Sequence, residues 1–533
     1  MEANRDRTQE EQDIAPPTTD TQTEIEPLLR RQSQTQSQRS QLSKQLTTRN
    51  AFAVLVSIQI GSGIFASPAQ VDSNVPSPGA ALLVWVVGGL LSWAGAASFA
   101  ELGAALPLNG GMQEYLRHIY GDTMAFLMAW IYIMAVKPSS MAIQSIVIAE
   151  SIGSVSSPDP LATWKLKTIA VVAFVSMVLL NSINTKITIK LSESFTVVKI
   201  MTVSLIVTGG LIAVLAHLVD PNSSISGSRD WYSKDWFQSR PSVSEGKPVD
   251  WNNISEWERF GHYSAAIYAG LWAYDGWDNA NVVASEIRDP GRSLPKAIKL
   301  AMVVVLSSYE LVNLAYYILL PWDLMSSSDA VAVAAARSLF GRPAGIIITV
   351  LVAISCAGSI TSNVFAVGRL TVAASQRNYL PGFLGKRGLP RQFQKHTLTT
   401  SDSSSDDGAL SCRSTNNEEN SILSTYFDAP IYAHILALVI TLVYILSGSF
   451  RALLTFVGMA EWVFYVATVI GLIILRSREP DLHRPYQPVL VLPIIFIVVG
   501  TLMIVRSAMF APLQSGVLAA LLVVGAVVSK LRR

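Results

Sequence analysis

Long apolar stretches recur along this chain, and they constrain its fold more than any other feature. A helix needs about 20 residues to cross the ~30 Å hydrocarbon core of a membrane. Stretches of roughly this length lie at 50–74, 80–106, 120–150, 166–184, 190–218, 261–284, 297–321, 343–377, 430–449, 452–475, 488–507 and 511–529. Lipid offers the backbone no hydrogen-bond partner, so spanning segments of this length must be helical. We therefore predict an all-α polytopic membrane protein with twelve transmembrane helices.

The composition supports this class and argues against several others. Half of the residues are hydrophobic and only 15% are charged, against about a quarter charged in a soluble domain. A net charge of +2 gives no reason to expect a nucleic-acid partner. Two cysteines and six scattered histidines form neither a disulfide framework nor a metal motif, so we predict no metal and no cofactor. No P-loop, HExxH or GxSxG occurs, which leaves ATP hydrolysis and hydrolase chemistry without support.

Basic residues predict the orientation, because they concentrate in cytoplasmic loops. One set of short loops carries Arg117, Lys186, Lys190, Arg288, Arg292, Lys296, Lys299, Arg377, Lys386, Arg387, Arg391, Arg476, Arg478 and Arg484. The opposite short loops are nearly free of them, as in 71–79. Both termini fall on the basic side and are predicted to be cytoplasmic. The N-glycosylation sequons at Asn222 and Asn253 both lie in the long loop 219–258, which this rule places outside.

Polar segments divide the chain. Residues 1–48 are rich in Gln, Thr, Ser, Arg and Glu and are predicted to be a disordered cytoplasmic tail. The membrane domain then covers 49–529, and 530–533 form a short cytoplasmic C-terminus. A Ser- and Asp-rich insertion at 391–428 is predicted to be a disordered cytoplasmic loop.

The first predicted helix is interrupted by Gly61-Ser62-Gly63, with Pro68 soon after. Glycines loosen a helix and expose its backbone, which membrane interiors tolerate only beside a cavity. A helix that restarts there directs free N–H groups at the cavity, a suitable seat for a carboxylate. The alternative is a small-residue face on which a neighbouring helix packs.

The sixth predicted helix contains Asp275, Gly276 and Asp278 within the span. An unpaired carboxylate at the bilayer centre costs about 2.5–3.5 kcal/mol on insertion scales. Asp275 should therefore face a partner, a substrate amine or water, and a structural salt bridge is the alternative. Two breaks five helices apart suggest inverted repeats formed by helices 1–5 and 6–10, with a substrate site between the breaks at the midplane.

Other charges within the predicted spans are Glu101, Lys137, Lys199, Glu310 and Glu461. Lys199 lies ~14 Å of helical rise into helix 5, too deep to reach the interface easily. Its ammonium could stand in for a metal cation, or it could pair with a buried glutamate. We interpret Glu101 and Glu310 as structural or interfacial.

Several motifs resemble the L-type amino acid transporter branch of the amino acid–polyamine–organocation superfamily. They are "IGSGIF", "SFAELGAALPLNGGMQEYL", "KPSS" and "GLWAYDGWDNANVVASEIRDP". The resemblance covers about 50–529 and implies twelve helices in a five-plus-five inverted repeat with helices 1 and 6 broken. It also implies amino acid transport by alternating access.

The resemblance implies a substrate site around residues 60–64 and 272–275. The amides of Ser62, Gly63 and Ile64, next to Gly61, would hold the substrate carboxylate. The carbonyls of Ile60, Trp272 and Ala273 would take the amino group, and Trp272, beside Tyr274 and Asp275, would be an aromatic gate. Lys199 matches a lysine that replaces sodium in sodium-independent members.

This sequence departs from the animal members of that branch. The loop between helices 3 and 4 has no cysteine, so no disulfide-linked heavy chain is expected. Asp275 stands where many neutral-amino-acid members have glycine, which makes basic cargo plausible. Glu461 replaces an uncharged polar residue and is a candidate for tuning selectivity or carrying a proton. The missing heavy chain and the long polar tail resemble microbial members, including methionine permeases.

We therefore hypothesise a sodium-independent secondary transporter of amino acids, with large neutral ones first, acting as an exchanger or a proton symporter. Asp275 and Glu461 are the candidates for carrying protons. The alternative is a non-transporting amino acid sensor of the same fold. The expected location is the plasma membrane, although "EIEPLL" in the tail keeps a vacuolar or endosomal membrane as the second option.

Overall fold

Helices make up nearly all of the regular structure. The computed structural model describes residues 47–532 except 109, 157–160, 184, 222, 224, 245–246, 283, 285–286, 327–329 and 387–428. The predicted tail up to residue 46, the insertion 391–428 and Asn222 lie outside the described residues.

Each predicted span coincides with a helix or with a pair of helices. In the described part of the chain, nine helical segments are long and apolar enough to cross a membrane. They are α4 (Pro78–Ala105), α6–η1–α7 (Asp122–Ile131, Tyr132–Val136 and Lys137–Ser156), α8 (Thr163–Ile183), α9 (Thr185–Val219), α13 (Pro290–Leu319), α15 (Val331–Gln376), α19 (Phe450–Arg478), α20 (Val491–Phe510) and α21 (Pro512–Leu531). A tenth apolar helix, α18 (Ile431–Ser447), is shorter.

The two remaining predicted spans hold interrupted helices. The first divides into α2 (Thr48–Gln59) and α3 (Gly63–Asp72), and the sixth into α11 (Glu256–Ala273) and α12 (Asn279–Val282). The break predicted in each of these two helices is therefore present in the structure.

Short elements connect the long helices. They are α5 (Met112–Tyr120), α10 (Asp230–Ser233), β1 (Ser242–Ser244), β2 (Lys247–Val249), α14 (Trp322–Met325) and the 3₁₀ helix η3 (Gly382–Gly385). Strands β1 and β2 pair antiparallel within the loop 219–258, with Val243 opposite Pro248.

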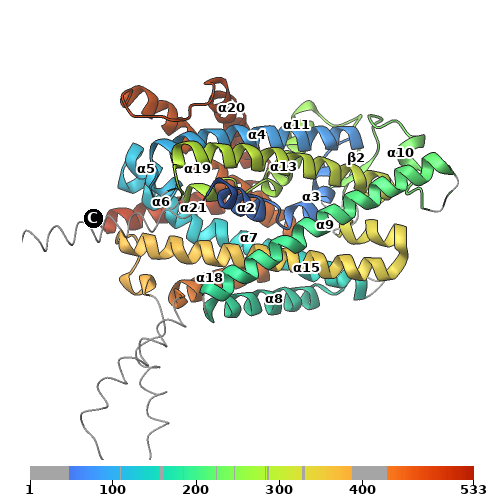
Figure 1. The fold of residues 1–533 in the computed structure, drawn as a ribbon, viewed down its shortest axis with the longest axis horizontal. Coiled ribbons are helices and arrows are strands. Elements are labelled where there is room, and N and C mark those ends of the chain that lie inside the picture. Colours follow the sequence, from blue (N-terminus) through green and yellow to red (C-terminus); the bar gives the residue numbers. More distant parts are fainter. Residues whose placement is uncertain are drawn as a thin grey trace, which may run out of the picture.

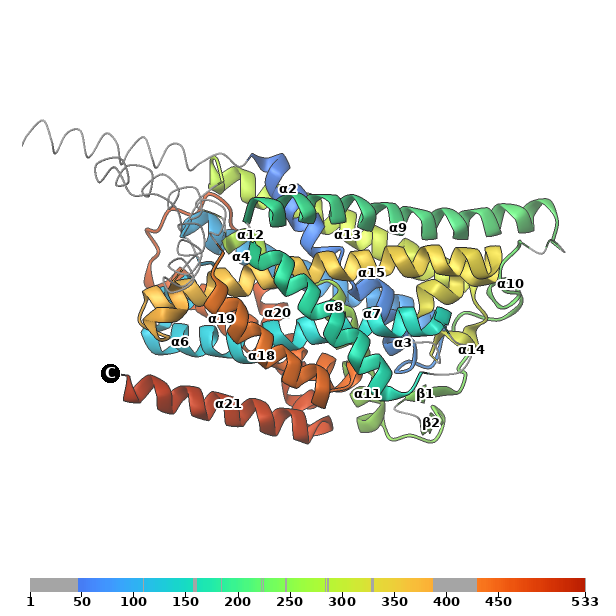
Figure 2. The ribbon, with the colours of Figure 1, turned by 90° about the horizontal axis from the view of Figure 1, so that it is seen from below.

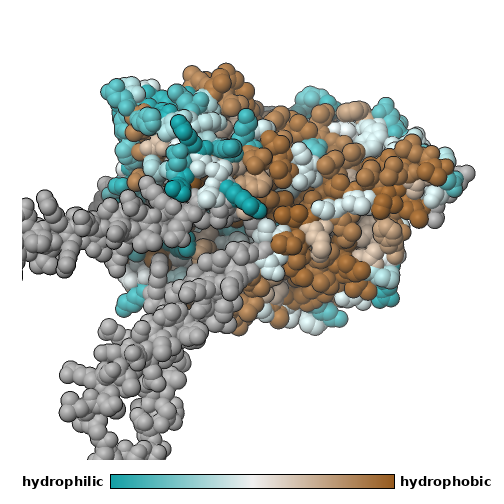
Figure 3. Space-filling view, in the orientation of Figure 1, coloured by the Kyte–Doolittle hydropathy of each residue, from teal (hydrophilic) through white to brown (hydrophobic). Residues whose placement is uncertain are grey.

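The long helices run approximately along the longest axis of the molecule (Figure 1). The same arrangement is visible from below, where α9, α13 and α15 extend along that axis and the C-terminal end of α21 lies near α6 (Figure 2). Hydrophobic side chains form a broad area over α8, α9 and α15, and hydrophilic ones gather at the end that carries α5 (Figure 3). This distribution is that of a protein embedded in lipid between two polar ends.

Serines begin several helices at the end that bears the loop 219–258. The side chains of Ser77, Ser255 and Ser449 accept hydrogen bonds from backbone N–H groups in the first turns of α4, α11 and α19. Such caps satisfy donors that have no partner within the helix. All three caps lie at the same end of the molecule, so they determine where these three helices begin.

Helix α15 is longer than its predicted span of 343–377. It begins at Val331 and bends at Gly341, whose φ of 73° interrupts the helical backbone just before Pro343. Glycine tolerates this left-handed region, and proline two residues later restarts the helix.

Glu101 has the structural role that its position suggested. Its buried carboxylate accepts hydrogen bonds from Arg476 Nε at 3.0 Å and Nη2 at 2.5 Å, and Arg484 Nε lies 3.5 Å away. This cluster joins the end of α4 to the end of α19 on the side predicted to be cytoplasmic.

Candidate functional site

The break in the first helix leaves three consecutive backbone donors without acceptors. Helix α2 ends at Gln59, and α3 begins at Gly63, with Ser62 as its N-cap. Ser62 O accepts from the N–H groups of residues 65 and 66 at 3.1 and 3.2 Å. Among the described residues, the N–H groups of Ser62, Gly63 and Ile64 donate to no protein acceptor. An N-terminus with free donors attracts a carboxylate through hydrogen bonds and through the helix dipole.

The break in the sixth helix is a tight turn that requires glycine. Between α11 and α12 the backbone turns through Gly276, whose φ of 106° most side chains disfavour. A Cβ at Gly276 would lie 2.6 Å from Ile58 Cγ2, next to the end of α2. The two breaks therefore lie against each other.

Gly63 provides the closest contact between these breaks. A Cβ there would lie 2.5 Å from Ala273 Cα and 2.9 Å from Ala273 Cβ, at the end of α11. Only a residue without a side chain allows this approach. The structure thus brings residues 60–64 and 272–275 together, as the predicted site requires.

Tyr309 on α13 joins the two broken helices, and sequence reasoning missed it. Its hydroxyl, fully buried, lies 2.6 Å from Gln59 O and 2.9 Å from Ala273 O, the last carbonyls of α2 and α11. The hydroxyl has one hydrogen, so it donates to one of these two carbonyls at a time, and Ala273 O, which was predicted to take a substrate amino group, can receive it. Trp272 O, the second predicted acceptor, accepts from Asp275 N at 3.2 Å.

The aromatic side chains of the helix-6 break are buried. Trp272 is 8% exposed, and its ring meets Phe450, the first residue of α19, edge-on at 6.2 Å. Tyr274 is enclosed by Trp85 at 5.9 Å and by Tyr309 at 4.8 Å. Trp272 therefore lies where the break meets α19, while Tyr274 packs away into the core.

Lys199, on α9, lies next to the helix-1 break. The residue is 1% exposed, and its ammonium donates to Ser359 Oγ on α15 at 3.1 Å. A Cβ at Gly61 would lie 3.2 Å from the same oxygen. Ser359 thus links the buried ammonium to the unwound backbone of the first helix.

Asp275 and Glu461, which the sequence suggested separately, share a partner. The hydroxyl of Tyr465 lies 3.0 Å from Asp275 Oδ1 and 3.1 Å from Glu461 Oε1. The hydroxyl of Tyr132 lies 3.4 Å from Glu461 Oε1. Lys137 interacts electrostatically with both carboxyl groups and with Asp278. The direct partner of Asp275 is therefore a tyrosine hydroxyl.

A local change of helix type positions two members of this group. Helix 3 was predicted as one continuous span, but the five residues of η1 form a π-helix before α7 begins at Lys137. The wider turn places the Lys137 ammonium over the Tyr132 ring, 5.8 Å from its centroid. π-Helical turns of this kind are frequent at functional sites.

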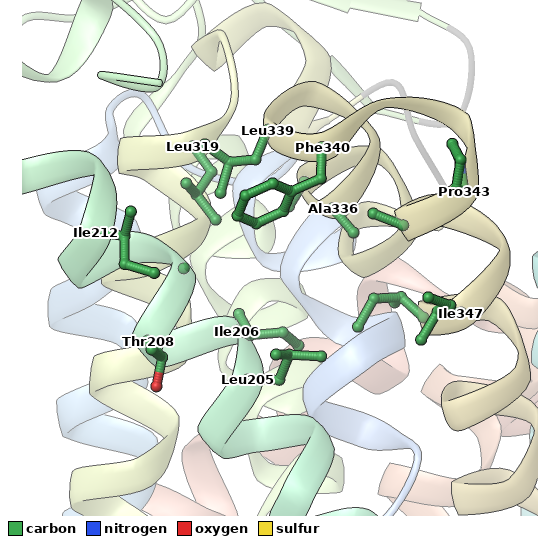
Figure 4. Close-up of a pocket in the computed structure, with 14 residues that line it drawn as sticks. Leu205, Ile206, Thr208, Ile212, Leu319, Ala336, Leu339, Phe340, Pro343 and Ile347 are labelled. Atoms are coloured by element: carbon green, nitrogen blue, oxygen red, sulfur yellow. The ribbon is translucent and has the colours of Figure 1, made fainter. Parts of the chain in front are cut away.

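A pocket of about 410 Å³ lies elsewhere, between α9, α13 and α15. Its lining is apolar apart from Thr208, and Figure 4 shows Leu205, Phe340 and Ile347 around it. None of the predicted site residues lines it. The two charges of an amino acid would find no partner there, so we do not assign it as the substrate site.

Of the two predicted glycosylation sites, Asn253 is exposed in the loop after β2, where its side chain donates to Asp250 at 2.6 Å. Asn222 lies outside the described residues.

Two broken helices in contact, one with free N–H groups at its restart, are typical of the binding sites of membrane transporters. A family model described as amino acid permease matches residues 46–528. The chain therefore belongs to this family and is a transporter rather than an enzyme.

Named relatives agree with this assignment. The chain is 28% identical to the b(0,+)-type amino acid transporter 1 of Mus musculus, over 90% of its own length and 85% of the relative's. It is 28% identical to the cystine/glutamate transporter of Homo sapiens (90% and 83%) and to the Asc-type amino acid transporter 1 of Mus musculus (90% and 79%).

Proposed function

We propose that this chain moves amino acids across the membrane by alternating access and binds them between the two broken helices. The observation that carries the proposal is the row of free N–H groups at Ser62, Gly63 and Ile64. These donors would hold the substrate carboxylate. Ile60 O, together with the remaining acceptor capacity of Trp272 O and Ala273 O, would hold its amino group. The names of the relatives, all amino acid transporters, support this class of cargo.

The proposed cargo is large neutral L-amino acids, methionine among them, with basic amino acids as the second class. Asp275 supports basic cargo through its negative charge, but Tyr465 already donates to it and Lys137 interacts with it. These two contacts reduce its attraction for a second cation, so we place neutral cargo first.

The proposed architecture is twelve crossings in two inverted repeats of five helices followed by two more. It is supported by the two breaks five helices apart and by the match of each predicted span to a helix.

We propose that both termini are cytoplasmic, that the loop 219–258 is external and glycosylated at Asn222 and Asn253, and that the protein resides in the plasma membrane. The vacuolar membrane is the second candidate. The loop between helices 3 and 4 has no cysteine, so no disulfide-linked heavy chain is proposed.

We propose that transport needs no sodium, because the ammonium of Lys199 lies behind the helix-1 break, where a cation could otherwise be held. Its contact with Ser359, which adjoins Gly61, supports this placement.

The test is uptake of labelled leucine by proteoliposomes that contain the full chain, with or without trapped unlabelled leucine, at equal pH on both sides. Trapped substrate should stimulate uptake, and replacing sodium by choline should leave the rate unchanged. Competition by methionine and arginine would then rank the cargo. If uptake is absent here and also with an inward proton gradient, transport is refuted and the sensor hypothesis is favoured.

A further inference from the structure

One tyrosine hydroxyl bridges two carboxyl groups that belong to different helices. Tyr465 Oη is 3.0 Å from Asp275 Oδ1 in the helix-6 break and 3.1 Å from Glu461 Oε1, one turn earlier on α19. Both distances are hydrogen-bond distances. Tyr465 and Glu461 are buried, at 1% and 3% exposure, so no bulk water separates these groups.

The number of available hydrogens limits how many hydrogen bonds this bridge can form. A tyrosine hydroxyl has one hydrogen to donate, and an ionised carboxylate can only accept. If Tyr465 donates to one carboxylate, its oxygen faces the other at 3.0–3.1 Å with no hydrogen between them. Both contacts become hydrogen bonds when the second carboxyl group carries a proton and donates it to Oη. The bridge is therefore complete with one proton shared by Asp275 and Glu461.

The surrounding charges also favour one proton on this pair of carboxyl groups. The break adds a third carboxyl group at Asp278, and helix 3 supplies the ammonium of Lys137, which interacts with all three. Glu461, Asp278 and Lys137 are buried and Asp275 is half-buried, so three carboxylates and one ammonium in or beside a low-dielectric interior leave an excess of negative charge. Like charges that share a buried site favour protonation of one of them.

Tyrosines are the other titratable groups of the described residues that interact with these carboxyl groups. Tyr132 approaches Glu461, and Tyr115 on α5 binds Asn281 beside Asp278. Arg476 is fifteen residues beyond Glu461 on α19, about 22 Å of helical rise, and is paired with Glu101. Arg506 on α20 donates to Trp257 O. Neither arginine neutralises the bridge.

We propose that Asp275 and Glu461 bind one proton between them through Tyr465, and that this proton is taken up and released in each transport cycle as a co-substrate. Asp275 belongs to the helix-6 break, so any movement of the break on substrate binding changes the bridge. This inference rests on the proposed transport function and adds a proton to it.

The test uses proteoliposomes with wild-type protein, Glu461→Gln, Tyr465→Phe and the control Glu150→Gln, a carboxyl group on α7 outside the bridge. Counterflow into vesicles that hold unlabelled leucine measures transport without net proton movement. Accumulation into empty vesicles, with an acidic exterior and a clamped membrane potential, measures proton coupling. Wild-type and Glu150→Gln proteins should accumulate leucine in response to the gradient. Glu461→Gln should keep counterflow, but its uptake should be the same with and without the gradient.

The other possible results separate failure of the proton proposal from failure of the transport function. Wild-type counterflow with no response to the gradient overturns the proton proposal and leaves the transport function intact, whereas the absence of both refutes transport itself. A gradient response that survives in Glu461→Gln also overturns the proposal. If Glu461→Gln loses both activities, Tyr465→Phe decides, because it keeps both carboxyl groups. Tyr465→Phe should keep counterflow, and its response to the proton gradient should be weaker than that of the wild type. A response equal to that of the wild type would contradict the proposal.

Discussion

Gly63 meets two requirements of the proposed site, a free backbone donor and a close contact between the two breaks. Its N–H is one of the free donors at the start of α3, and its missing side chain allows that start to touch Ala273. Either requirement alone could be met in other ways. Their combination requires glycine, because any Cβ would separate the two breaks.

Gly63→Ala is therefore expected to reduce leucine uptake strongly while the protein still reaches the membrane. The added methyl group would overlap Ala273, and overpacking of this kind costs about 1–3 kcal/mol. Counterflow per reconstituted molecule is the measurement. Gly516→Ala is the matched control, because a Cβ at that position of α21 meets nothing within 4 Å. Equal activity of the two variants would contradict the site.

Tyr309→Phe tests the link between the two broken helices. It removes a hydroxyl that lies against Gln59 O and Ala273 O and leaves buried carbonyls without this donor. An unsatisfied buried acceptor costs about 1–3 kcal/mol. We expect a lower melting temperature and slower counterflow. Tyr444→Phe, which loses one hydroxyl contact with Met134 O on helix 3, should affect counterflow less, and an equal loss would argue against a special role for Tyr309.

At the scale of elements, the loop 219–258 binds the C-terminal end of α3. Arg240 donates to the fully buried Asp72, which also accepts from Tyr317 at 2.6 Å. Ser242 and Ser244, at the two ends of β1, donate to Ser73 O and Asn74 Oδ1, each at 3.1 Å. Arg240 and the hairpin thus hold the end of the first helix, which Asp72 also links to α13 through Tyr317.

Arg240→Ala should release this end of α3. It leaves the carboxylate of Asp72 buried without its cation, and breaking a buried pair costs about 3–5 kcal/mol. We expect a lower melting temperature and greater reactivity of a cysteine introduced at Ser73 toward a membrane-impermeant reagent. Arg259→Ala removes an ion pair with the exposed Glu256 and should change both readings little. Unchanged reactivity in Arg240→Ala would show that Arg240 does not restrain α3.

The elements also show why some features could be predicted and others could not. Lipid imposes length and hydropathy on each span, so the helices followed from the apolar stretches, and glycine and buried carboxylates marked the two breaks. The π-helix η1 and the bridge at Tyr465 depend on which helices pack together. A buried tyrosine such as Tyr309 looks the same in sequence whether it fills the core or joins two helix ends.

At the scale of the whole molecule, the polar ends and the charge pattern predict one orientation. The arginines that hold Glu101 lie at the same ends of α4 and α19 as the basic loops, whereas Asn253 lies in the loop at the opposite end. Inserting the chain the other way would place many basic residues outside, against the usual bias.

Glycosylation and antibody access can test this orientation together. We expect Asn253→Gln and Asn222→Gln each to remove one glycan-dependent shift in gel mobility when the chain is made in eukaryotic cells. Tags at either terminus should stay inaccessible to antibody until the cells are permeabilised. A tag inserted between β1 and β2, in the loop predicted to be external, is the positive control for access. Because an odd number of crossings would place the two termini on opposite sides, accessibility of only one terminal tag would refute the twelve-helix topology, whatever the glycosylation pattern.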